Sequence, residues 1–255
     1  EELGLDADCK VNEDWVSILS SHFTDPLVAG VGGPNVTINE NATFLARCIG
    51  ILMESFLGSA GTRNTARYET LREVTHNPTV NSAVRKSVLE EIEGFDSSLI
   101  VSEDVDLDAR IRRRGYKLLY DPKMIVWHHR RDTLRRFVRQ MYRYGRGRAS
   151  VFLRYAKSLP WTYLCAASLT LGTAFTIPFC LVSQSIATIA FCGWGIYLLS
   201  ISSLSAYIAL KKRTLSYAVV LPFLAFVEHF TLGLGFLAGL IWPYGRHSRL
   251  MSTDL

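Results

Sequence analysis

The stretch GFDSSLIVSEDVDLDARIRRRGYKLLYDP, residues 94–122, decides the fold class. A helix predicted over residues 82–93 ends at the first glycine of this stretch. Ser102 is placed to cap a second helix, whose first turn is acidic and which ends at the next glycine. Residues 116–120 then predict a strand, which Asp-Pro closes. This alternation of helix and strand indicates an α/β fold.

The residues on either side continue the alternation. Apolar residues at helical spacing predict helices over residues 12–21 and 44–57. Residues 28–36 predict a strand interrupted by glycines, and residues 125–128 predict another. Residues 3–5 read as the end of a strand whose sheet we expect to be missing.

The second half of the chain is apolar. Three apolar runs lie at residues 161–183, 185–210 and 215–242, and each reaches the ~20 residues that a helix needs to cross a bilayer. The charged side chains between residues 161 and 242 are Lys211, Lys212, Arg213 and Glu228. The sequence therefore predicts about three transmembrane helices over 161–242, followed by a tail at 243–255.

A basic segment precedes these spans. Eight arginines and one acid, Asp132, lie between Arg130 and Arg148. Next to a membrane span, such a segment indicates the cytosolic side and attraction to anionic lipid. We therefore interpret residues 131–160 as a basic amphipathic juxtamembrane segment of an integral membrane protein, and we expect no nucleic acid partner.

The first candidate site is the loop Asp6-Ala-Asp8, which follows a strand end. Two carboxylates one residue apart can hold Mg²⁺ or Mn²⁺ and leave metal positions for diphosphate oxygens. The metal would neutralise charge on a departing nucleotide diphosphate. A solvated turn is the alternative interpretation.

The second candidate site is Glu103-Asp104 at the start of a helix. Capping alone explains acids there, but a carboxylate beside an acceptor hydroxyl can also act as a general base. We interpret Asp106 and Asp108, further along the helix, as surface acids.

Two further groups are candidates for ligand binding. Adjacent strand residues point to opposite faces, so at most one of His128 and His129 can face a metal or diphosphate. Gln140, Arg143 and Tyr144 lie at helical spacing and could hold a diphosphate and stack on a sugar. The alternatives are surface histidines and an amphipathic helix that lies on lipid headgroups.

The order of these signals resembles the family-2 glycosyltransferases with the GT-A fold, in particular membrane-bound members that build exopolysaccharide or lipid-linked sugars. The resemblance rests on the Asp-x-Asp loop, Gly-Gly-Pro-Asn at 32–35, the block at 94–122 and the Gln-x-x-Arg-Tyr segment before the membrane spans. It implies that residues 1–130 are part of a Rossmann-like GT-A catalytic domain, and that the enzyme is inverting.

The resemblance also implies roles for single residues. Asp8 would bind the metal, Asp6 would lie near the ribose or the metal, and Asp104 would be the catalytic base. The Gln-x-x-Arg-Tyr segment, Gln140 to Tyr144, would contact the donor diphosphate and the acceptor end. Tyr stands where the family motif has Trp, which weakens the expectation of processive polymerisation.

In this family a nucleotide-binding half precedes the Asp-x-Asp loop, whereas Asp6 lies close to the first residue here. We therefore expect this chain alone to lack the pocket for the base and to be inactive. A membrane adaptor descended from such a transferase is the alternative function. A small permease fits three spans poorly, because transporters usually pair repeated halves.

Overall fold

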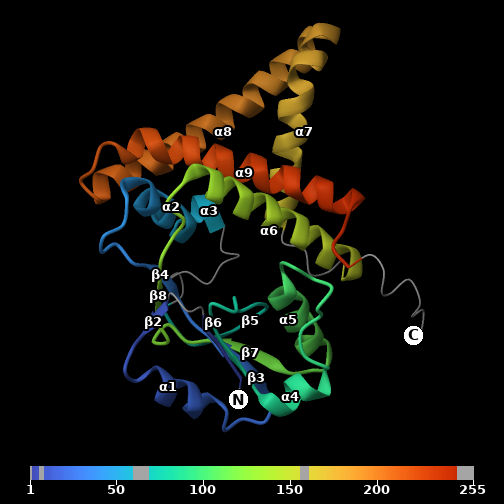
Figure 1. Cartoon of the computed structure of the whole chain (residues 1–255). Helices are drawn as coiled ribbons and strands as arrows, with labels where there is room; N and C mark the ends of the chain where they lie inside the picture. Colours follow the sequence, from blue (N-terminus) through green and yellow to red (C-terminus); the bar gives the residue numbers. More distant parts are fainter. Residues whose placement is uncertain (1, 6–8, 60–68, 156–160, 246–255) are drawn as a thin grey trace.

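The computed structural model describes residues 2–5, 9–59, 69–155 and 161–245, which form an α/β domain beneath a group of long helices (Figure 1). The elements in chain order are β1 (Glu2–Leu5), β2 (Cys9–Val11), α1 (Trp15–His22), β3 (Val28–Gly32), β4 (Asn35–Thr37), α2 (Phe44–Glu54), α3 (Phe56–Ser59), β5 (Arg72–Val74), β6 (Asn81–Val84), α4 (Lys86–Glu91), α5 (Glu103–Arg113), β7 (Lys117–Tyr120), β8 (Val126–His128), α6 (Leu134–Arg154), α7 (Trp161–Val182), α8 (Gln184–Lys211) and α9 (Tyr217–Ile241).

The described strands form two sheets. One has five strands in the order β1-β6-β3-β7-β5, with β3 and β7 parallel and the other pairs antiparallel. The other has three strands in the order β2-β8-β4. The expectation that the first strand lacks its sheet is wrong, because β1 pairs along its length with β6.

The helix predicted over residues 82–93 is wrong in its first part. Residues 81–84 form β6, which is hydrogen-bonded to β1 on one side and to β3 on the other. The buried Asn81 amide also donates hydrogen bonds to the backbone oxygens of Pro34 and Met124. The helix α4 begins only at Lys86. Two sheet neighbours outweigh the helical spacing of the apolar residues.

The strand predicted over residues 28–36 is divided between the two sheets. Gly33 lies between β3 and β4, and a Cβ atom there would lie 2.2 Å from the backbone oxygen of Met124. Only glycine allows this close approach, so the chain leaves one sheet here and enters the other.

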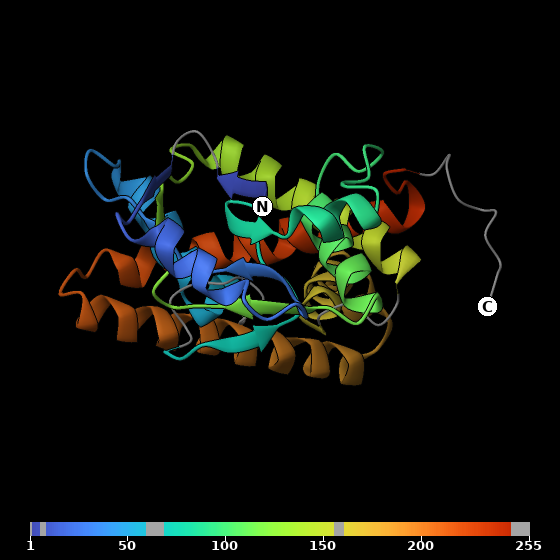
Figure 2. The same ribbon diagram turned by 90° about the horizontal axis from the view of Figure 1, so that it is seen from below.

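Helices cover both faces of the larger sheet (Figure 2). Successive strand residues point to opposite faces, so Ala83 packs with Trp15 of α1, whereas Val84 packs with Ile111 of α5. The helix α4 adds Val88 to the second of these clusters. The sheet therefore holds α5, with its acidic first turn, in a fixed position.

The long helix α6 crosses above the sheet and lies alongside α9 (Figure 1). Glycines allow the two backbones to touch. A Cβ atom on Gly145 would lie 2.0 Å from the backbone oxygen of Leu232, and one on Gly235 would lie 2.1 Å from that of Tyr142. The apolar side of α6, including Phe137 and Met141, is buried in a protein core. This apolar side is therefore covered by protein and not by lipid headgroups, which was one alternative from the sequence.

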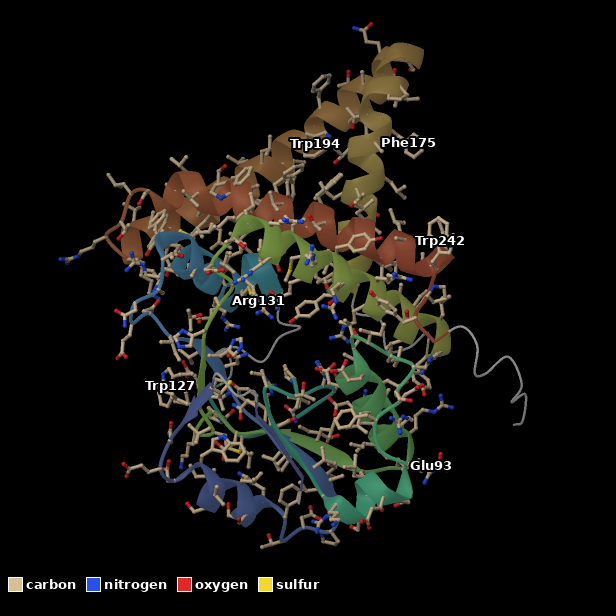
Figure 3. The ribbon with its side chains drawn as sticks, in the orientation of Figure 1. Glu93, Trp127, Arg131, Phe175, Trp194 and Trp242 are labelled. Atoms are coloured by element: carbon tan, nitrogen blue, oxygen red, sulfur yellow. The ribbon has the colours of Figure 1, made fainter. Side chains whose placement is uncertain are left out.

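The end of α7 and the start of α8 extend away from the rest of the chain (Figure 3). Phe175 on α7 is about half exposed, and Ile189 and Phe191 on α8 are mostly exposed. The indole of Trp194 donates a hydrogen bond to Thr176, which joins the two helices. This pair of helices presents apolar side chains outward.

Two helices, α8 and α9, are long and apolar enough to cross a membrane by length and composition. The most apolar part of α8 is 6% buried, whereas that of α9 is 44% buried against other helices. The first predicted span, residues 161–183, corresponds to α7, and its membrane-spanning character stays a prediction.

Candidate active site

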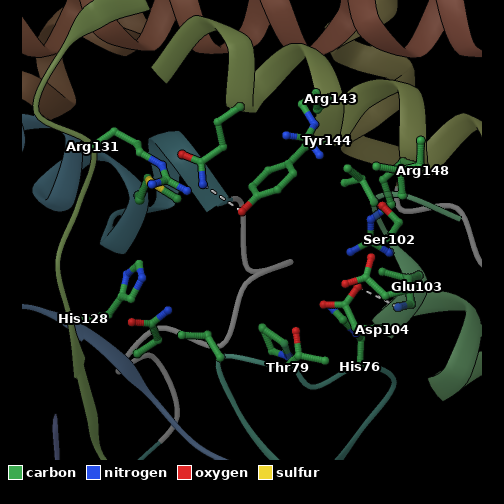
Figure 4. Close-up of a pocket in the computed structure, with 18 of the residues that line it drawn as sticks. His76, Thr79, Ser102, Glu103, Asp104, His128, Arg131, Arg143, Tyr144 and Arg148 are labelled. Carbon is green, nitrogen blue, oxygen red and sulfur yellow. Dashed lines mark hydrogen bonds and ion pairs between the residues drawn. The ribbon is translucent and has the colours of Figure 1, made fainter. Parts of the chain in front are cut away.

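A cavity of about 500 Å³ lies between the start of α5 and the underside of α6. We call it the α5–α6 cavity (Figure 4). It brings together most of the site residues predicted from the sequence: Glu103, Asp104, His128, Gln140, Arg143 and Tyr144. These residues come from three elements that are separate in the sequence.

The start of α5 holds the two predicted carboxylates in the cavity wall. Ser102 has φ 66° and ψ 22°, a left-handed conformation that is costly for a residue with a side chain. This bend turns the chain into α5 directly at Glu103. Ser102 occupies the capping position, but its side chain makes no capping hydrogen bond, so the predicted cap is wrong. An Asp104 carboxylate oxygen instead accepts from the backbone NH of Val105.

Asp104 has a neighbour that the sequence did not indicate. Nε2 of His76 lies 3.8 Å from Oδ2 of Asp104, and Nδ1 of the same ring lies 2.7 Å from Oδ2 of Asp108. The backbone NH of Asn77 also donates to Asp108. The imidazole is therefore fixed between the two carboxylates.

Asp108 is buried, so its interpretation as a surface acid is wrong. Burial raises the pKa of its carboxyl, and the contact with His76 acts in the opposite direction. Asp104 and Asp108 are four residues apart on a helix and so share a face. That spacing was the signal that could have linked them. Nothing in the sequence near His76 suggested a role for it.

Asp106 is also buried, and it is not the surface acid expected from the sequence. Its carboxylate accepts from Arg110 at 2.8 Å and lies 3.3 Å from Arg154 at the end of α6. Arg154 lies 2.6 Å from Asp96 of the Gly-Phe-Asp segment. Burial acts to raise the pKa of Asp96, but hydrogen bonds from Ser98 and Arg154 outweigh it and lower the pKa to about 2. This network joins α6 to the start of α5.

The underside of α6 forms the roof of the cavity. Gln140 and Tyr144 lie one helical turn apart, and the Gln140 amide donates to the Tyr144 hydroxyl at 2.9 Å. Arg143 projects from the same helix (Figure 4). The cavity is strongly basic, because six arginines line it: Arg130, Arg131, Arg136, Arg139, Arg143 and Arg148.

The two histidines at the end of β8 are separated as the strand geometry predicts. His128 lines the cavity, whereas His129 is exposed and is not one of the lining residues. His128 also pairs with Cys9 in the smaller sheet. His129 is therefore a surface residue.

The predicted metal ligands Asp6 and Asp8 lie outside the described residues. Their described neighbours Leu5 and Cys9 pair with Asn81 and with the cavity residue His128. Within the described part of the chain, no three His, Cys, Asp or Glu side chains are grouped as a metal site requires. A site for Mg²⁺ or Mn²⁺ thus stays a prediction.

Comparison with known proteins identifies the family. A model of glycosyl transferase family group 2 matches residues 3–238, which include the residues that line the cavity and the long helices except the last turn of α9. The chain belongs to this family. Membership in the family agrees with the arrangement of the cavity, in which a carboxylate at a helix start faces a basic roof.

Several curated relatives of the family are similar to parts of the chain. The pre-mycofactocin glycosyltransferase of Mycobacterium tuberculosis is 30% identical over 151 residues, which cover 59% of this chain and 31% of the relative. The poly-beta-1,6-N-acetyl-D-glucosamine synthase of Staphylococcus aureus is 27% identical over 152 residues, covering 59% of this chain and 35% of the relative.

A third relative covers more of the chain. The dolichyl N-acetyl-alpha-D-glucosaminyl phosphate 3-beta-D-2,3-diacetamido-2,3-dideoxy-beta-D-glucuronosyltransferase of Methanococcus voltae is 23% identical over 218 residues, covering 85% of this chain and 62% of the relative. The chain thus spans between about a third and three fifths of the lengths of these three relatives.

Proposed function

We propose that the chain belongs to an inverting glycosyltransferase, which moves a sugar from a nucleotide-diphosphate sugar to a lipid-linked or polysaccharide acceptor at the membrane. The observation that carries this proposal is the α5–α6 cavity, in which the Asp104 carboxylate faces the arginines of α6. The names of the relatives from Methanococcus voltae and Staphylococcus aureus agree with a lipid-linked or polysaccharide acceptor.

In the proposed reaction, Asp104 is the general base. Its carboxylate takes the proton of an acceptor hydroxyl, and the oxygen of that hydroxyl forms a bond to the anomeric carbon. The bond from the anomeric carbon to the diphosphate breaks at the same time, and its electron pair leaves with the nucleotide diphosphate. One displacement inverts the configuration at the anomeric carbon. His76 keeps the Asp104 carboxylate oriented for this step, since it contacts Asp104 and is fixed by Asp108.

The roof of the cavity supports departure of the diphosphate. Guanidinium groups bind phosphate oxygens through two parallel hydrogen bonds, and they stabilise the negative charge that develops on a leaving group. Arg143 and Arg131 project into the cavity and are placed for this role (Figure 4). Tyr144, fixed by Gln140, presents an aromatic ring on which a sugar could stack. Mg²⁺ or Mn²⁺ would add positive charge at the diphosphate if Asp6 and Asp8 hold it as the sequence predicts.

The apolar helices support a membrane location. The most apolar part of α8 is only 6% buried among the described residues, and a bilayer would cover its exposed apolar side chains. The arginines beside the first predicted span support a catalytic part on the cytosolic face of the cell membrane, by the positive-inside rule. The acceptor would then reach the cavity from the membrane surface.

The test uses the protein made from the complete reading frame, in nanodiscs with Mn²⁺ and a panel of nucleotide sugars. Release of nucleotide diphosphate is followed with and without lipid acceptors, and product is identified by mass spectrometry. Asp104→Asn should lower the rate of transfer at least a hundredfold, since a general base contributes about 10²–10⁴-fold. Glu90→Gln, which changes an exposed acid outside the cavity, is the matched control.

Two results would contradict the proposal. One is transfer by Asp104→Asn at the rate of the control. The other is a folded, membrane-inserted protein that releases nucleotide diphosphate from no donor, which would favour the membrane adaptor.

A further inference from the structure

The α5–α6 cavity contains arginines in excess of its acids. Its acidic lining residues are Glu103 and Asp104, against six arginines. Arg130 is held by hydrogen bonds to β4, and Arg136 pairs with Asp132. Within the described ranges, the structure assigns no hydrogen bond or carboxylate partner to Arg131, Arg139, Arg143 and Arg148. The arginines of the cavity therefore carry more positive charge than its own carboxylates neutralise, and this excess favours the binding of an anionic ligand.

The free arginines do not all lie on one side. Figure 4 shows Arg131 beside His128 at one side of the cavity, whereas Arg148 reaches down toward Glu103 and Asp104 at the other side. Arg131 precedes the start of α6 at Leu134, whereas Arg148 lies near the end of this helix, about 20 Å further along it at the usual rise of about 1.5 Å per residue. The two sides therefore form separate anion subsites.

The two sides correspond to the two substrates of the proposed reaction. His128 pairs with Cys9, the residue that directly follows the Asp-x-Asp loop, so the donor diphosphate is expected on the side of His128 and Arg131. The general base must face the acceptor hydroxyl, which places the acceptor on the side of Asp104 and Arg148. An arginine on the acceptor side does not face the diphosphate of the donor. Its positive charge is therefore available to an anionic group of the acceptor.

The fold fixes Arg148 next to the base. A Cβ atom on the preceding residue, Gly147, would lie 2.6 Å from Oγ of Ser102 and 2.7 Å from the backbone oxygen of Val101. The backbone of α6 therefore touches the bend that leads into α5. Cζ of Arg148 lies 5.6 Å from the centroid of the Tyr163 ring. A guanidinium that stacks on a ring keeps its N–H edges available for a phosphate group.

Tyr163, which lines the cavity beside Arg148, connects this side of the cavity to the proposed membrane region. Tyr163 belongs to α7, and it is buried in an apolar cluster with Ala149 of α6 and Phe236 of α9. The helix α7 continues into the pair of helices with outward apolar side chains. A ligand that enters beside Tyr163 can thus keep an apolar chain in the bilayer while its polar end reaches Arg148.

We propose that Arg148 and Tyr163 form a subsite for the phosphate group of a membrane lipid carrier, so that the sugar acceptor is a phosphate-bearing lipid and not an uncharged polysaccharide. This inference rests on the proposed function, because it takes Asp104 as the base that faces the acceptor. The Arg148 guanidinium binds two phosphate oxygens of the carrier, and this contact holds a hydroxyl of the sugar that the carrier already bears toward Asp104.

The experiment measures binding to the protein in phosphatidylcholine nanodiscs by calorimetry, with three probes: farnesyl phosphate, farnesol and inorganic phosphate. Farnesyl phosphate is expected to bind at least tenfold more tightly than either of the others. Arg148→Gln should weaken its binding about tenfold or more, since a hydrogen bond to a charged group contributes about 1.5–3 kcal/mol. Arg148→Lys keeps the positive charge but loses the planar guanidinium that binds two oxygens at once. It should weaken the binding of farnesyl phosphate less than Arg148→Gln does.

Two matched variants test whether the effect belongs to Arg148 itself. Arg135→Gln removes the same charge from α6 outside the cavity, and it should leave the binding of farnesyl phosphate unchanged. Arg131→Gln should weaken the binding of the nucleoside diphosphate of the donor and leave the binding of farnesyl phosphate unchanged. If Arg148→Gln does not fold, Arg148→Lys alone decides, since unchanged binding in that variant contradicts a bidentate contact.

The remaining outcomes each have a definite meaning. Equal binding of farnesol shows that the site recognises only the apolar chain, and equal binding of inorganic phosphate shows a site for a free anion. Either result overturns the lipid-carrier assignment, as does unchanged binding in Arg148→Gln. If no donor supports transfer but these binding differences hold, the proposed transferase fails while the phosphate subsite stands.

Discussion

Nδ1 of His76 lies 2.7 Å from the buried carboxylate of Asp108, and Nε2 of the same ring lies 3.8 Å from Asp104. A side chain from the loop before β6 thereby links two acids on one face of α5. The pair Asp108 and His76 therefore holds the proposed base in position.

We expect His76→Ala to lower kcat about tenfold with little change in the KM of the donor, because loss of the imidazole leaves Asp104 free to turn away from the acceptor. Asp108→Asn should lower kcat by a smaller factor, since an amide oxygen can still accept from His76. Steady-state kinetics over a range of donor and acceptor concentrations separates the two parameters.

The chain offers a matched control for this prediction. His22 and Asp121 form another His–Asp contact of 2.7 Å, outside the cavity. His22→Ala should lower the thermal stability and leave kcat unchanged. An equal loss of kcat in both variants would mean that His76 acts only through stability.

The contact of Asp96 with Arg154 should make stability depend on pH in the acid range. The pKa of Asp96 is lowered from 3.8 to about 2, so the folded state favours the ionised carboxyl by about 2 kcal/mol. Because the pKa is lower in the folded state, this contribution is present above the unfolded value of 3.8 and is lost as the pH falls toward 2. Asp96→Asn should therefore destabilise the protein at pH 7, and the difference from wild type should shrink below about pH 4.

Urea unfolding in detergent, followed by tryptophan fluorescence at several pH values, measures that difference. Glu91→Gln is the control, because Glu91 pairs with Arg114 on the exposed surface, where ion pairs contribute little. If Asp96→Asn lowers the free energy of unfolding by the same amount at every pH, the stabilisation by the contact of Asp96 with Arg154 is not electrostatic.

The sequence predicted the elements that carry strong local signals. The helix after Ser102, the strands at 116–120 and 125–128 and the first two helices all form close to their predicted positions. Gln140, Arg143, Tyr144, Asp104 and His128 were proposed from motif order, and the fold brings them to one cavity. Spacing along each element decides which of its side chains share a face, and the roles of these residues stay predictions.

What the sequence could not predict depends on contacts between distant segments. Residues 81–84 have helical spacing, yet two neighbouring strands hold them in the sheet. Asp106 and Asp108 look like surface acids until Arg154 and His76, at large separations in the chain, are placed against them. Burial of a charged group becomes acceptable only when such a partner exists, and no local pattern reveals it.

Removal of the metal tests the roles predicted for Asp6 and Asp8. EDTA should abolish transfer, and added Mn²⁺ or Mg²⁺ should restore it, because a bound metal neutralises the departing diphosphate. Asp8→Ala should lower transfer to the level in EDTA, and excess Mn²⁺ should not restore it. Binding of Mn²⁺ followed by electron paramagnetic resonance provides a readout apart from activity. Full transfer in EDTA would contradict the metal role.

The close packing of α6 on α9 gives a last prediction about the roof of the cavity. A Cβ atom on Gly145 would lie 2.0 Å from the backbone oxygen of Leu232 and 2.7 Å from the backbone nitrogen of Phe236, so neither contact can be relieved by a side-chain rotation. Gly145→Ala must push the two helices apart, and we expect it to cost about 1–3 kcal/mol or more. Because Gly145 follows Tyr144 and Arg143, the same shift should raise the KM of the donor.

Gly193→Ala in α8 is the matched control, since a Cβ atom there meets nothing within 4 Å. Alanine is the better helix former by about 1 kcal/mol, so this variant should be as stable as wild type or more so. Thermal unfolding of the two variants in the same detergent, together with donor kinetics, checks both statements. If Gly145→Ala unfolds at the temperature of Gly193→Ala, α6 can shift without cost, and the roof of the cavity does not depend on its contact with α9.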